Sequence, residues 1–521
     1  MRPLILVFLW AGIIFAQYPS LLWTADLQSQ CYGSPACADI DGDGFDEIVF
    51  GTYFDDEHAY ALNGEDGSVL WRFDVGGGPL DAAPVVFDVN GDGEDEVIIP
   101  ASWGILYCLS PAGEVVWRYP NSDYIECIDS PPAVADVDGD GLPEVIFGAW
   151  YGKVYVLNGE DGSLVWSNTY CDTGYVQSAP CIVDRDGDGA LDIVVAMFRG
   201  DHRVYALRGS DGAVLWTFTA DGYMYAGASC GDVDLDGRPE VVIGDYAGKV
   251  YALNAEDGSL LWQTSSLGYY IFAPTTIADI VPSSPGPEIL CAPAQYFGSD
   301  VVCLSSAGDS LWSFHTDGEV DRGAIVAEID DDPDLEVIFG AGHYLYVLNG
   351  EDGSEVWSYL LPDSFPIGNA PIAADFDADG DVDIFCIGGR GYSDTIPNYG
   401  RAFAVQAGPG GGATWTMYRH DRYRTGNLMG GPAKVVEGKV SVPGNITIAA
   451  APNPFNSLCR IEIFSSTAPE RVIITDISGR TVATFHTGEI VWEPKNLPAG
   501  VYILSAVVGG KSCTRKLVYL K

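Results

Sequence analysis

The sequence predicts an all-β protein, an eight-bladed β-propeller, with seven blades as the alternative, followed by a small Ig-like β-sandwich. Three observations predict this fold: an acidic loop that recurs at nearly fixed spacing, four strand-like segments in each repeat, and a different composition after residue 445. Repeated four-stranded units of roughly 48 residues are typical of propeller blades. A solenoid of sheets is the alternative.

The third repeat shows the order of segments within a unit. An apolar, β-branched run at 144–148 follows the acidic loop, and an alternating segment at 153–158 comes next. A Gly-rich turn at 159–163 leads to a last strand that ends near Trp166. These patterns predict four short strands separated by turns. The tryptophan recurs at Trp71, Trp117, Trp166, Trp216, Trp262, Trp312, Trp357 and Trp415.

The N-terminal segment 21–26 resembles the last strand of a unit but has no unit before it. Such a strand can complete the last blade and close the ring, which removes the free sheet edges. Because the last unit carries its own Trp415, seven blades with extra strands stay possible.

The acidic loops have the composition of a calcium site. In the cleanest copy, Asp136, Asp138, Asp140 and Glu144 stand at loop positions one, three, five and nine, with Gly141 at six. Carboxylates at this density repel one another unless a cation lies between them, and Ca²⁺ takes six to eight oxygen ligands. We therefore expect about six structural Ca²⁺ ions.

The expected side-chain ligands follow the same spacing in each unit. They are Asp39, Asp41, Asp43 and Glu47; Asp88, Asn90, Asp92 and Glu96; Asp136, Asp138, Asp140 and Glu144; Asp184, Asp186, Asp188 and Asp192; Asp232, Asp234, Asp236 and Glu240; and Asp375, Asp377, Asp379 and Asp383. Unit seven keeps Asp330, Asp332 and Glu336 but has Glu328 first and Pro333 in place of Gly, which predicts a weak site or none. Unit six keeps only Asp279 and predicts no ion.

The Asp-x-Asp-Gly-Asp-Gly loops resemble FG-GAP and VCBS repeats, as in integrin alpha-subunit propellers. The Asn-Gly-Glu-Asp-Gly-Ser-x-x-Trp turns resemble those of PQQ-type quinoprotein propellers. The resemblance covers roughly residues 21–426 and implies the fold and the calcium loops, but not the activity. We expect a propeller domain at 17–426.

The two ends of the chain indicate export. Residues 1–16 read as a cleaved secretory signal peptide, and no other segment is apolar enough to span a membrane. Residues 427–445 suit a linker, and residues 446–521 predict short strands with Gly and Pro turns. The segments 451–456, 472–480 and 496–504 resemble the type A sorting domain of the type IX secretion system. That resemblance implies recognition by the secretion machinery and a protein that is secreted or attached to the outer-membrane surface.

Charge and cysteine content limit the partners and the cross-links. The net charge of −47 argues against nucleic acid as a partner. Cys291 with Cys303, and Cys459 with Cys513, are candidate disulfide pairs in an exported chain.

The sequence contains no recognisable catalytic constellation, so we expect no catalytic or cofactor-binding residues besides the calcium ligands. Aromatic residues gather in loops expected on the face opposite the ion loops: Tyr53, Trp103, Trp150, Tyr151, Tyr246, Tyr296 and Phe297 between second and third strands, and Tyr124, Tyr175, Tyr223, Tyr225, Tyr269 and Tyr270 between blades. Exposed aromatic rings can stack on sugars or anchor a protein. Packing between blades is the alternative for Tyr53, Trp150 and Tyr246, which share one repeat position.

The leading hypothesis is a non-enzymatic binding or adhesion scaffold for carbohydrate or protein, although the sequence leaves enzymatic activity open. The second hypothesis is an extracellular polysaccharide lyase or hydrolase on a calcium-bearing propeller. A lyase needs a base and a cation to neutralise the substrate carboxylate. Arg199, His202 and Arg203 form the local cluster that the sequence offers for these roles.

Overall fold

The computed structural model describes residues 18–428, apart from 77, 121–124, 331, 333, 363–364, 391–396, 411, 416 and 420–424. In the C-terminal part it describes 447–519, apart from 452–458, 465–470, 477–479, 486–489, 493–496, 499 and 509–510. The signal peptide expected at 1–16 and the linker expected at 427–445, except its first two residues, lie outside the described residues. The chain divides into two compact units, Met1–Asn90 with Glu94–Val435, and Gly91–Gly93 with Val436–Lys521.

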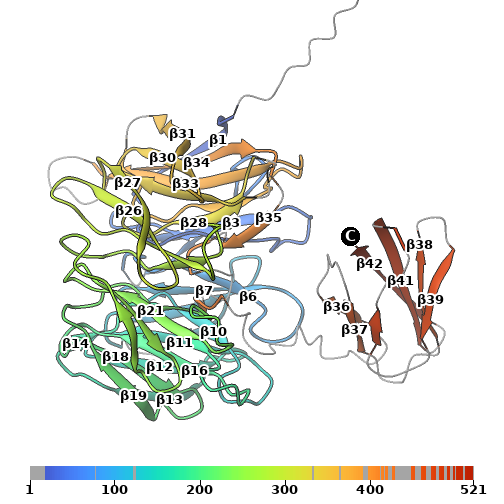
Figure 1. The fold of residues 1–521 in the computed structure, drawn as a ribbon, viewed down its shortest axis with the longest axis horizontal. Helices are drawn as coiled ribbons and strands as arrows, with labels where there is room; N and C mark the ends of the chain where they lie inside the picture. The colour runs from blue at the N-terminus through green and yellow to red at the C-terminus, as the bar shows by residue number, and fades with distance from the viewer. Residues whose placement is uncertain are drawn as a thin grey trace, which may run out of the picture. The chain divides into compact units, whose positions relative to one another are not determined.

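The larger unit is an eight-bladed propeller, as predicted, and its sheets follow one another in colour in Figure 1. The first four blades are β2 (Ala36–Ala38), β3 (Glu47–Gly51), β4 (His58–Asn63), β5 (Val69–Asp74); β6 (Val85–Phe87), β7 (Glu96–Ala101), β8 (Ile105–Leu109), β9 (Val115–Tyr119); β10 (Ala133–Ala135), β11 (Glu144–Ala149), β12 (Lys153–Asn158), β13 (Leu164–Thr169); and β15 (Cys181–Val183), β16 (Asp192–Ala196), β18 (Arg203–Arg208), β19 (Val214–Thr219). A short pair, β14 (Gly174–Tyr175) and β17 (Phe198–Arg199), lies beside the fourth.

The next three blades follow the same antiparallel order. They are β20 (Ser229–Gly231), β21 (Glu240–Gly244), β22 (Val250–Asn254), β23 (Leu260–Gln263); β24 (Thr276–Ala278), β25 (Glu288–Cys291), β26 (Ser299–Leu304), β27 (Ser310–Thr316); and β28 (Ile325–Glu328), β29 (Glu336–Ala341), β30 (Tyr344–Asn349), β31 (Glu355–Leu360). The eighth blade has β32 (Ile372–Ala374), β33 (Val382–Arg390) and β34 (Tyr399–Gly408).

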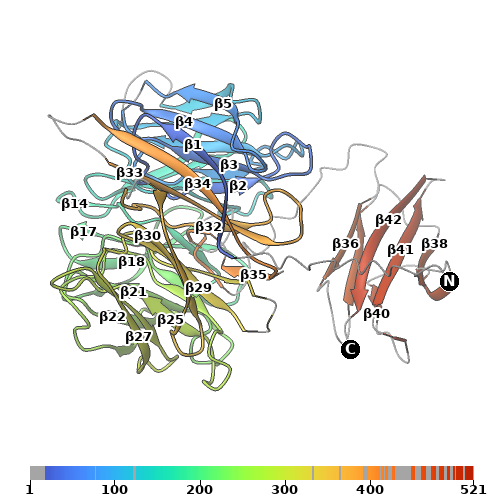
Figure 2. The same ribbon diagram turned by 90° about the horizontal axis from the view of Figure 1, so that it is seen from above.

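The N-terminal strand β1 (Ser20–Leu27) is the fourth strand of the eighth blade. It pairs antiparallel with β34, from Ser20 opposite Gln406 to Leu27 opposite Gly400, and Figure 2 shows the two strands side by side. This confirms the predicted ring closure. Trp415 does not belong to the tryptophan series: it lies in β35 (Gly412–Trp415), which pairs with the innermost strand β28 of blade seven.

In seven of the blades, a tryptophan in the fourth strand is hydrogen-bonded to the turn of the next blade. Trp117 Nε1 donates to Gly159 O at 2.7 Å, and Trp23 of β1 does the same to Gly64 O at 2.6 Å, so the contact also crosses the point of closure. The same bond forms from Trp71, Trp166, Trp216, Trp262 and Trp312. The repeated tryptophans therefore hold neighbouring blades in register.

The apolar core lies between the blades. In blade three every residue of β11 is buried, whereas β13 is largely partly or fully exposed. One cluster combines residues of β6–β8 with Val145, Phe147 and Leu157 of the following blade. Because apolar area removed from water stabilises by roughly 25 cal/mol per Å², these faces supply the main cohesion of the ring.

The chain after blade eight enters the central channel, which is lined by the innermost strands. Following β35, Ile182 N donates to Thr425 O at 3.1 Å, and Cys230 N donates to Gly426 O at 2.8 Å. Arg419, from the basic segment near the end of the propeller, is buried. Residues after β34 thus cover the inner edges of blades seven, four and five.

The smaller unit contains two antiparallel sheets. One has β36 (Thr447–Ala451), β37 (Cys459–Phe464) and β40 (Ile490–Trp492); the other has β38 (Arg471–Asp476), β39 (Thr481–Phe485), β41 (Gly500–Val508) and β42 (Lys511–Tyr519). Buried Trp492 and Tyr502 meet edge to face at 5.1 Å between ring centroids. The Ig-like character of this unit stays a prediction. The side chains of Cys459 and Cys513 lie outside the described residues.

Candidate functional site

Each acidic loop joins the first strand of a blade to the second, and its carboxylates fold the loop. In unit three, Asp136 accepts from Gly139 N at 2.8 Å and from Gly141 N at 3.1 Å. Glu144 Oε2 accepts from Val137 N at 2.8 Å. The loop backbone thereby wraps around its own acidic side chains, and the Gly at position six permits this tight turn.

The structure brings the predicted ligands of several units together. Oxygen atoms of each of the following sets lie within 4.8 Å of one another: Asp39, Asp41 and Asp43; Asp136, Asp138 and Glu144; Asp184, Asp186 and Asp188; Asp232, Asp234 and Glu240; and Asp330, Asp332 and Glu336. Such clusters can hold a metal ion. Unit seven, where the sequence predicted a weak site or none, also brings three carboxylates together, but they come from loop positions three, five and nine, whereas those of unit three come from positions one, three and nine.

In the carboxylate at position nine of unit three, one oxygen accepts a hydrogen bond from the loop backbone and the other has no hydrogen-bond partner. Glu144 is fully buried, and its Oε1 has no hydrogen-bond partner, as is also true of Glu47 Oε1. Burial, together with the neighbouring charge of Asp138, raises the pKa of Glu144 to about 8. A hard cation beside these oxygens would remove the cost of burying the charge. Glu288 of unit six has the same unpartnered oxygen in a loop that keeps only Asp279 of the other ligand positions, so the carboxylate clusters, rather than this oxygen, distinguish the ion loops.

Unit four contains a competitor that the ligand spacing did not reveal. Arg185 lies 2.8 Å from Asp186 Oδ2 and 2.8 Å from Asp192 Oδ2, two of the predicted ligands. A guanidinium already neutralises part of this loop. In unit eight, Gln406 Nε2 donates to Asp379 at 2.7 Å.

The second candidate site is a cavity of about 490 Å³ at one end of the channel. Its walls come from blade-to-blade connections and from loops between second and third strands. Because strands alternate in direction, these loops lie on the face opposite the acidic loops. A hollow of about 10 Å³ adjoins it and shares Asp81, Tyr225, Phe272 and Arg322; Tyr418 of the channel segment also lines that hollow.

One residue from each blade-to-blade connection reaches this site. Each follows a buried residue (Leu80 and Met224 are two of these) that anchors the connection just before an innermost strand. We call the eight residues the rim positions: Tyr32, Asp81, Asp129, Gln177, Tyr225, Phe272, Asp321 and Gly368. The repeats share their strands and the buried residue before the rim position, but they carry different residues at the rim position itself. All eight rim positions line the cavity or the adjoining hollow.

Tyr53, Tyr246 and Tyr270 extend the aromatic wall. Tyr246 and Tyr270 stack with centroids 5.3 Å apart, and Tyr225 stacks on Phe272 at 4.0 Å. Burial raises the pKa of Tyr53 to about 12 and that of Tyr225 to about 12. The hydroxyls therefore stay protonated and can donate hydrogen bonds.

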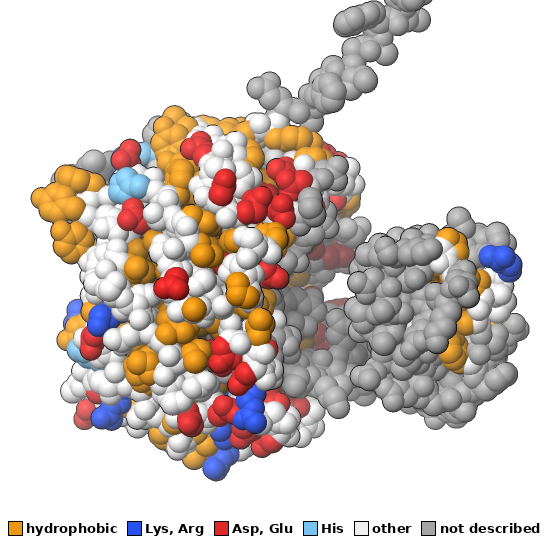
Figure 3. Space-filling view, viewed as in Figure 1, with side chains coloured by type: hydrophobic (Ala, Val, Ile, Leu, Met, Phe, Trp, Pro, Cys, Tyr) orange, Lys and Arg blue, Asp and Glu red, His pale blue; other side chains and the backbone are white. Residues whose placement is uncertain are grey.

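The charge of the cavity is negative. Asp81 and Asp321 are rim positions, Glu319 adds a third carboxylate, and Arg322 is the basic side chain among the described lining residues. Burial raises the pKa of Asp81 and of Asp321, and Arg322 opposes the rise in both. Acidic side chains are also scattered over the propeller face in Figure 3.

The structure sorts the predicted aromatic residues into groups. Tyr53, Tyr225, Tyr246 and Tyr270 line the cavity. Trp150 instead stacks on Tyr175 at 4.7 Å. The following residues are exposed and do not line it: Trp103, Tyr151, Tyr223, Tyr269, Tyr296 and Phe297. Tyr124 lies outside the described residues.

The predicted basic cluster is separate from the cavity. Arg199 lies over the Tyr175 ring at 5.8 Å, His202 meets Tyr223 edge to face at 4.2 Å, and Arg203 lies 3.7 Å from Asp201. None of the three basic side chains lines the cavity. Cys291 and Cys303 are unpaired thiols, with Cys303 opposite Leu290 in the strand register.

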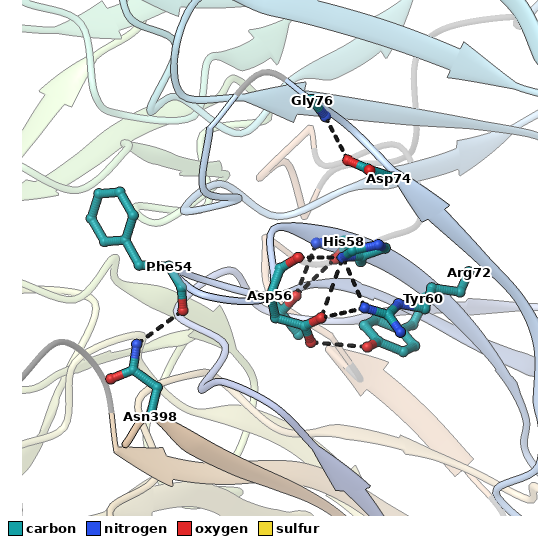
Figure 4. Close-up of polar contacts among 9 residues, drawn as sticks. Phe54, Asp56, His58, Tyr60, Arg72, Asp74, Gly76 and Asn398 are labelled. Carbon is teal, nitrogen blue, oxygen red and sulfur yellow. Dashed lines mark hydrogen bonds and ion pairs between the residues drawn. The ribbon is translucent and has the colours of Figure 1, made fainter. Parts of the chain in front are cut away.

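A further polar cluster in blade one resembles an active site at first sight. Buried Asp56 accepts from Tyr60 at 2.9 Å and from Arg72 at 2.8 Å, and it contacts His58 (Figure 4). The equivalent third-strand tyrosines repeat the contact, as Tyr155 to Glu126, Tyr205 to Asp201 and Tyr251 to Asp245. A contact repeated blade after blade serves the fold, so we assign this cluster a structural role.

Comparisons with known families agree with this architecture. The model of the outer membrane protein assembly factor BamB family, a PQQ-type repeat family, matches residues 19–140 and 143–269. The model of the secretion system C-terminal sorting domain matches residues 449–520. The sorting domain indicates that the protein is secreted or displayed at the cell surface. The resemblance of the loops to FG-GAP and VCBS repeats stays a prediction.

Solved structures show the same fold at low sequence identity. The V. cholerae biofilm matrix protein Bap1 superposes with a TM-score of 0.58 at 16% identity, covering 80% of this chain and 97% of its own. Saccharomyces cerevisiae Sqt1 gives 0.54 at 12% identity, covering 75% and 100%. The quinohemoprotein alcohol dehydrogenase ADHIIG of Pseudomonas putida gives 0.53 at 12% identity, covering 75% and 76%.

A comparison with curated proteins found no match. The described residues contain no helix of the length and apolarity needed to cross a membrane.

Proposed function

We propose that this protein is a non-enzymatic, calcium-stabilised surface propeller that binds carbohydrate in the cavity at the channel end. The observation that carries the proposal is the set of rim positions, where one residue from each of eight similar connections lines a single site. Repeats with the same strand structure but a different residue at one loop position that lines the cavity are typical of a scaffold that carries its binding residues on loops.

The lining suits a polyhydroxylated ligand. Partly exposed rings such as Tyr246 and Tyr270 offer flat faces on which a sugar can stack. Carboxylates such as Asp321 and Glu319 accept hydrogen bonds from sugar hydroxyls. The cavity lies within the range of about 300–1,000 Å³ that small-molecule sites usually have.

The acidic loops have a different role in this proposal. They lie on the opposite face, and their clustered oxygens match the hard-oxygen donor set that Ca²⁺ prefers. The ions would fix the turn between the first two strands of a blade. A cation that binds only the folded chain stabilises it by mass action.

Export fits the same reading. The sorting domain would direct the chain to the type IX machinery, and the propeller would then act outside the outer membrane. The biofilm matrix protein Bap1, which shares the propeller fold, is named for a function in an extracellular matrix. We therefore favour adhesion to matrix glycans over an intracellular role.

The charge of the cavity opposes the polysaccharide lyase reading. A lyase that acts on uronates must neutralise a substrate carboxylate, whereas three carboxylates face this cavity and Arg322 already contacts Asp81 at 3.4 Å. The Arg199 loop lies elsewhere. Binding without turnover is the function that this geometry supports best.

A binding and degradation screen tests the proposal. The purified exported protein, with and without Ca²⁺, is tested against an array of polysaccharides, and Tyr246→Ala is compared with Tyr296→Ala. We expect selective binding that Tyr246→Ala weakens at least ten-fold and Tyr296→Ala leaves unchanged, because Tyr296 lies outside the cavity and is 77% exposed. New reducing or unsaturated ends would overturn the non-enzymatic reading, and binding to no polysaccharide would overturn the carbohydrate assignment.

A further inference from the structure

We propose that the ligand of this cavity carries protonated amino groups, so that the substrate class is an oligosaccharide of amino sugars with free amines. This inference rests on the proposed function and specifies its ligand. It follows from three features of the cavity: the contacts of Arg322 (the basic side chain in its described lining), the charge of the rim positions, and the arrangement of the aromatic rings.

Arg322 is engaged by the protein itself. Its Nε donates to Tyr32 O at 2.9 Å, and its Nη2 lies 3.4 Å from Asp81 Oδ1. The guanidinium also lies over the Tyr225 and Phe272 rings at 5.8 and 5.6 Å. A cation with these contacts orders the rim and is poorly placed to neutralise an anionic ligand.

The carboxylates outnumber the basic side chain in the described lining, so the remaining charge is only partly compensated. After Asp81 is paired with Arg322, the described lining of the cavity still includes Asp321 and Glu319, and the adjoining hollow adds Asp129. Carboxylates gathered at a concave, partly dry surface attract cations and repel anions. An acidic polysaccharide is therefore disfavoured, and an ammonium group is favoured.

The aromatic rings strengthen the preference for a cation. Tyr53, Tyr246 and Tyr270 line the cavity together with the two carboxylates. Ring faces attract cations, with a stabilisation that grows as water is excluded. The same rings can stack on a sugar, so an amino sugar satisfies both parts of the lining at once.

The shape favours a sugar over a lysine side chain of a protein. A cavity of about 490 Å³ with rings on several sides offers stacking area that a single flexible alkyl chain would leave unfilled. Several rim positions can contact successive rings of an oligosaccharide. A protein partner is the alternative that the experiment must exclude.

The test compares two oligosaccharides of the same backbone whose amino groups are either free or acetylated. Isothermal titration calorimetry of the full-length protein uses a glucosamine tetramer and an N-acetylglucosamine tetramer at a pH where the free amines are protonated. We expect at least ten-fold tighter binding of the free amine, and the difference should shrink with added salt because exposed charges are screened. Equal binding of both would overturn the charge inference and leave carbohydrate binding intact.

Matched variants locate the effect. Asp321→Asn should reduce the preference for the free amine several-fold, whereas Glu160→Gln, which removes one charge from an exposed turn after β12, should not. Loss of binding to both tetramers in Asp321→Asn, with an unchanged melting temperature, would contradict a purely electrostatic role. Binding to neither tetramer by the wild type, or preference for a lysine-rich peptide, would overturn the inference, whereas the proposed function is decided separately by the polysaccharide array.

A second observation concerns Cys181 and Cys230, in the innermost strands of blades four and five. Their Sγ atoms lie 2.7 Å apart, and both side chains are fully buried. We infer that they form an inter-blade disulfide in the exported protein, where oxidising conditions permit it. Each thiol loses one proton and one electron to a thiol–disulfide oxidoreductase of the export compartment, and one S–S bond replaces two S–H bonds.

Peptide mapping of the exported protein without reductant tests this inference. We expect one cross-linked peptide pair containing Cys181 and Cys230, and a melting temperature that reductant lowers in the wild type but not in Cys181→Ser. Cys386→Ser is the control, since Cys386 is equally buried but lies in β33 of another blade. Alkylation of both thiols after unfolding without reductant would overturn the cross-link.

Discussion

Replacing Gly162 by Ala should destabilise the propeller more than its backbone conformation alone explains. Gly162 has φ of +68°, and a Cβ there would lie 2.6 Å from Cε3 of Trp117, the ring that joins blade two to blade three. Left-handed backbone costs an Ala roughly 1–2 kcal/mol. Forcing a methyl group into a packed contact adds about 1–3 kcal/mol. The sum is about 2–5 kcal/mol.

Gly76 supplies the matched control. Its φ is +54°, and a Cβ there would meet nothing within 4 Å. Gly76→Ala should therefore cost only the backbone part, roughly 1–2 kcal/mol. At about 2.1 cal/mol/K per residue, a propeller of roughly 400 residues shifts its melting temperature by about 1 °C per kcal/mol.

Scanning calorimetry of the two variants, and of both changes in a Trp117→Ala background, measures the effect. Because Ala lacks the ring, Gly162→Ala should then cost about as much as Gly76→Ala, which gives a coupling of about 1–3 kcal/mol between the two sites. Equal destabilisation by Gly162→Ala and Gly76→Ala in the wild-type background would refute the reasoning.

Three further predictions concern the ions, the cavity and the closure of the ring. Chelation should lower the melting temperature by several degrees, because a bound ion stabilises the folded state by mass action. Added Ca²⁺ should restore the melting temperature. An unchanged melting curve would contradict the structural role of the loops. Binding of the glucosamine tetramer should weaken as pH falls, since burial raises the pKa of Asp321 and the carboxylate form that attracts the amine is lost as pH drops through that value. Calorimetry at several pH values should show this, and a pH-independent affinity would contradict it. Deleting Ser20–Leu27 should leave β34 as an open edge and cause oligomers in light scattering, whereas a monomer of normal melting temperature would show that closure is dispensable.

The repeat made the fold predictable from sequence. Spacing of the acidic loops, alternation within the strands and the unaccompanied N-terminal strand each have a local signature, and β1 pairs with β34 as that signature predicts. Trp415 was harder to interpret, because β35 matches the last strand of a unit in composition but pairs with β28 through a long-range contact.

The cavity was only partly predictable for the same reason. Tyr53, Tyr225, Tyr246 and Tyr270 were found because aromatic residues stand out in polar loops. Asp81 and Arg322 were missed, since they are 241 residues apart and become neighbours only when the ring closes. Alignment of the eight connections to one another would have revealed the rim positions, because the residue type varies there while the residue before it is apolar in each connection. Arg185 was missed because ligand spacing ignores the residue between two ligands.

The closure of the ring also sets an order of events during synthesis. β1 is made before any complete blade, but its partner Gln406 is separated from Ser20 by almost the whole propeller. A chain that stops early has no partner for its first strand and presents two unpaired edges. The ring can close only when the last blade is complete, so a closed ring distinguishes the full-length propeller from a fragment. The sorting domain follows the last blade in the chain, so truncated chains would lack both the closed ring and the sorting domain.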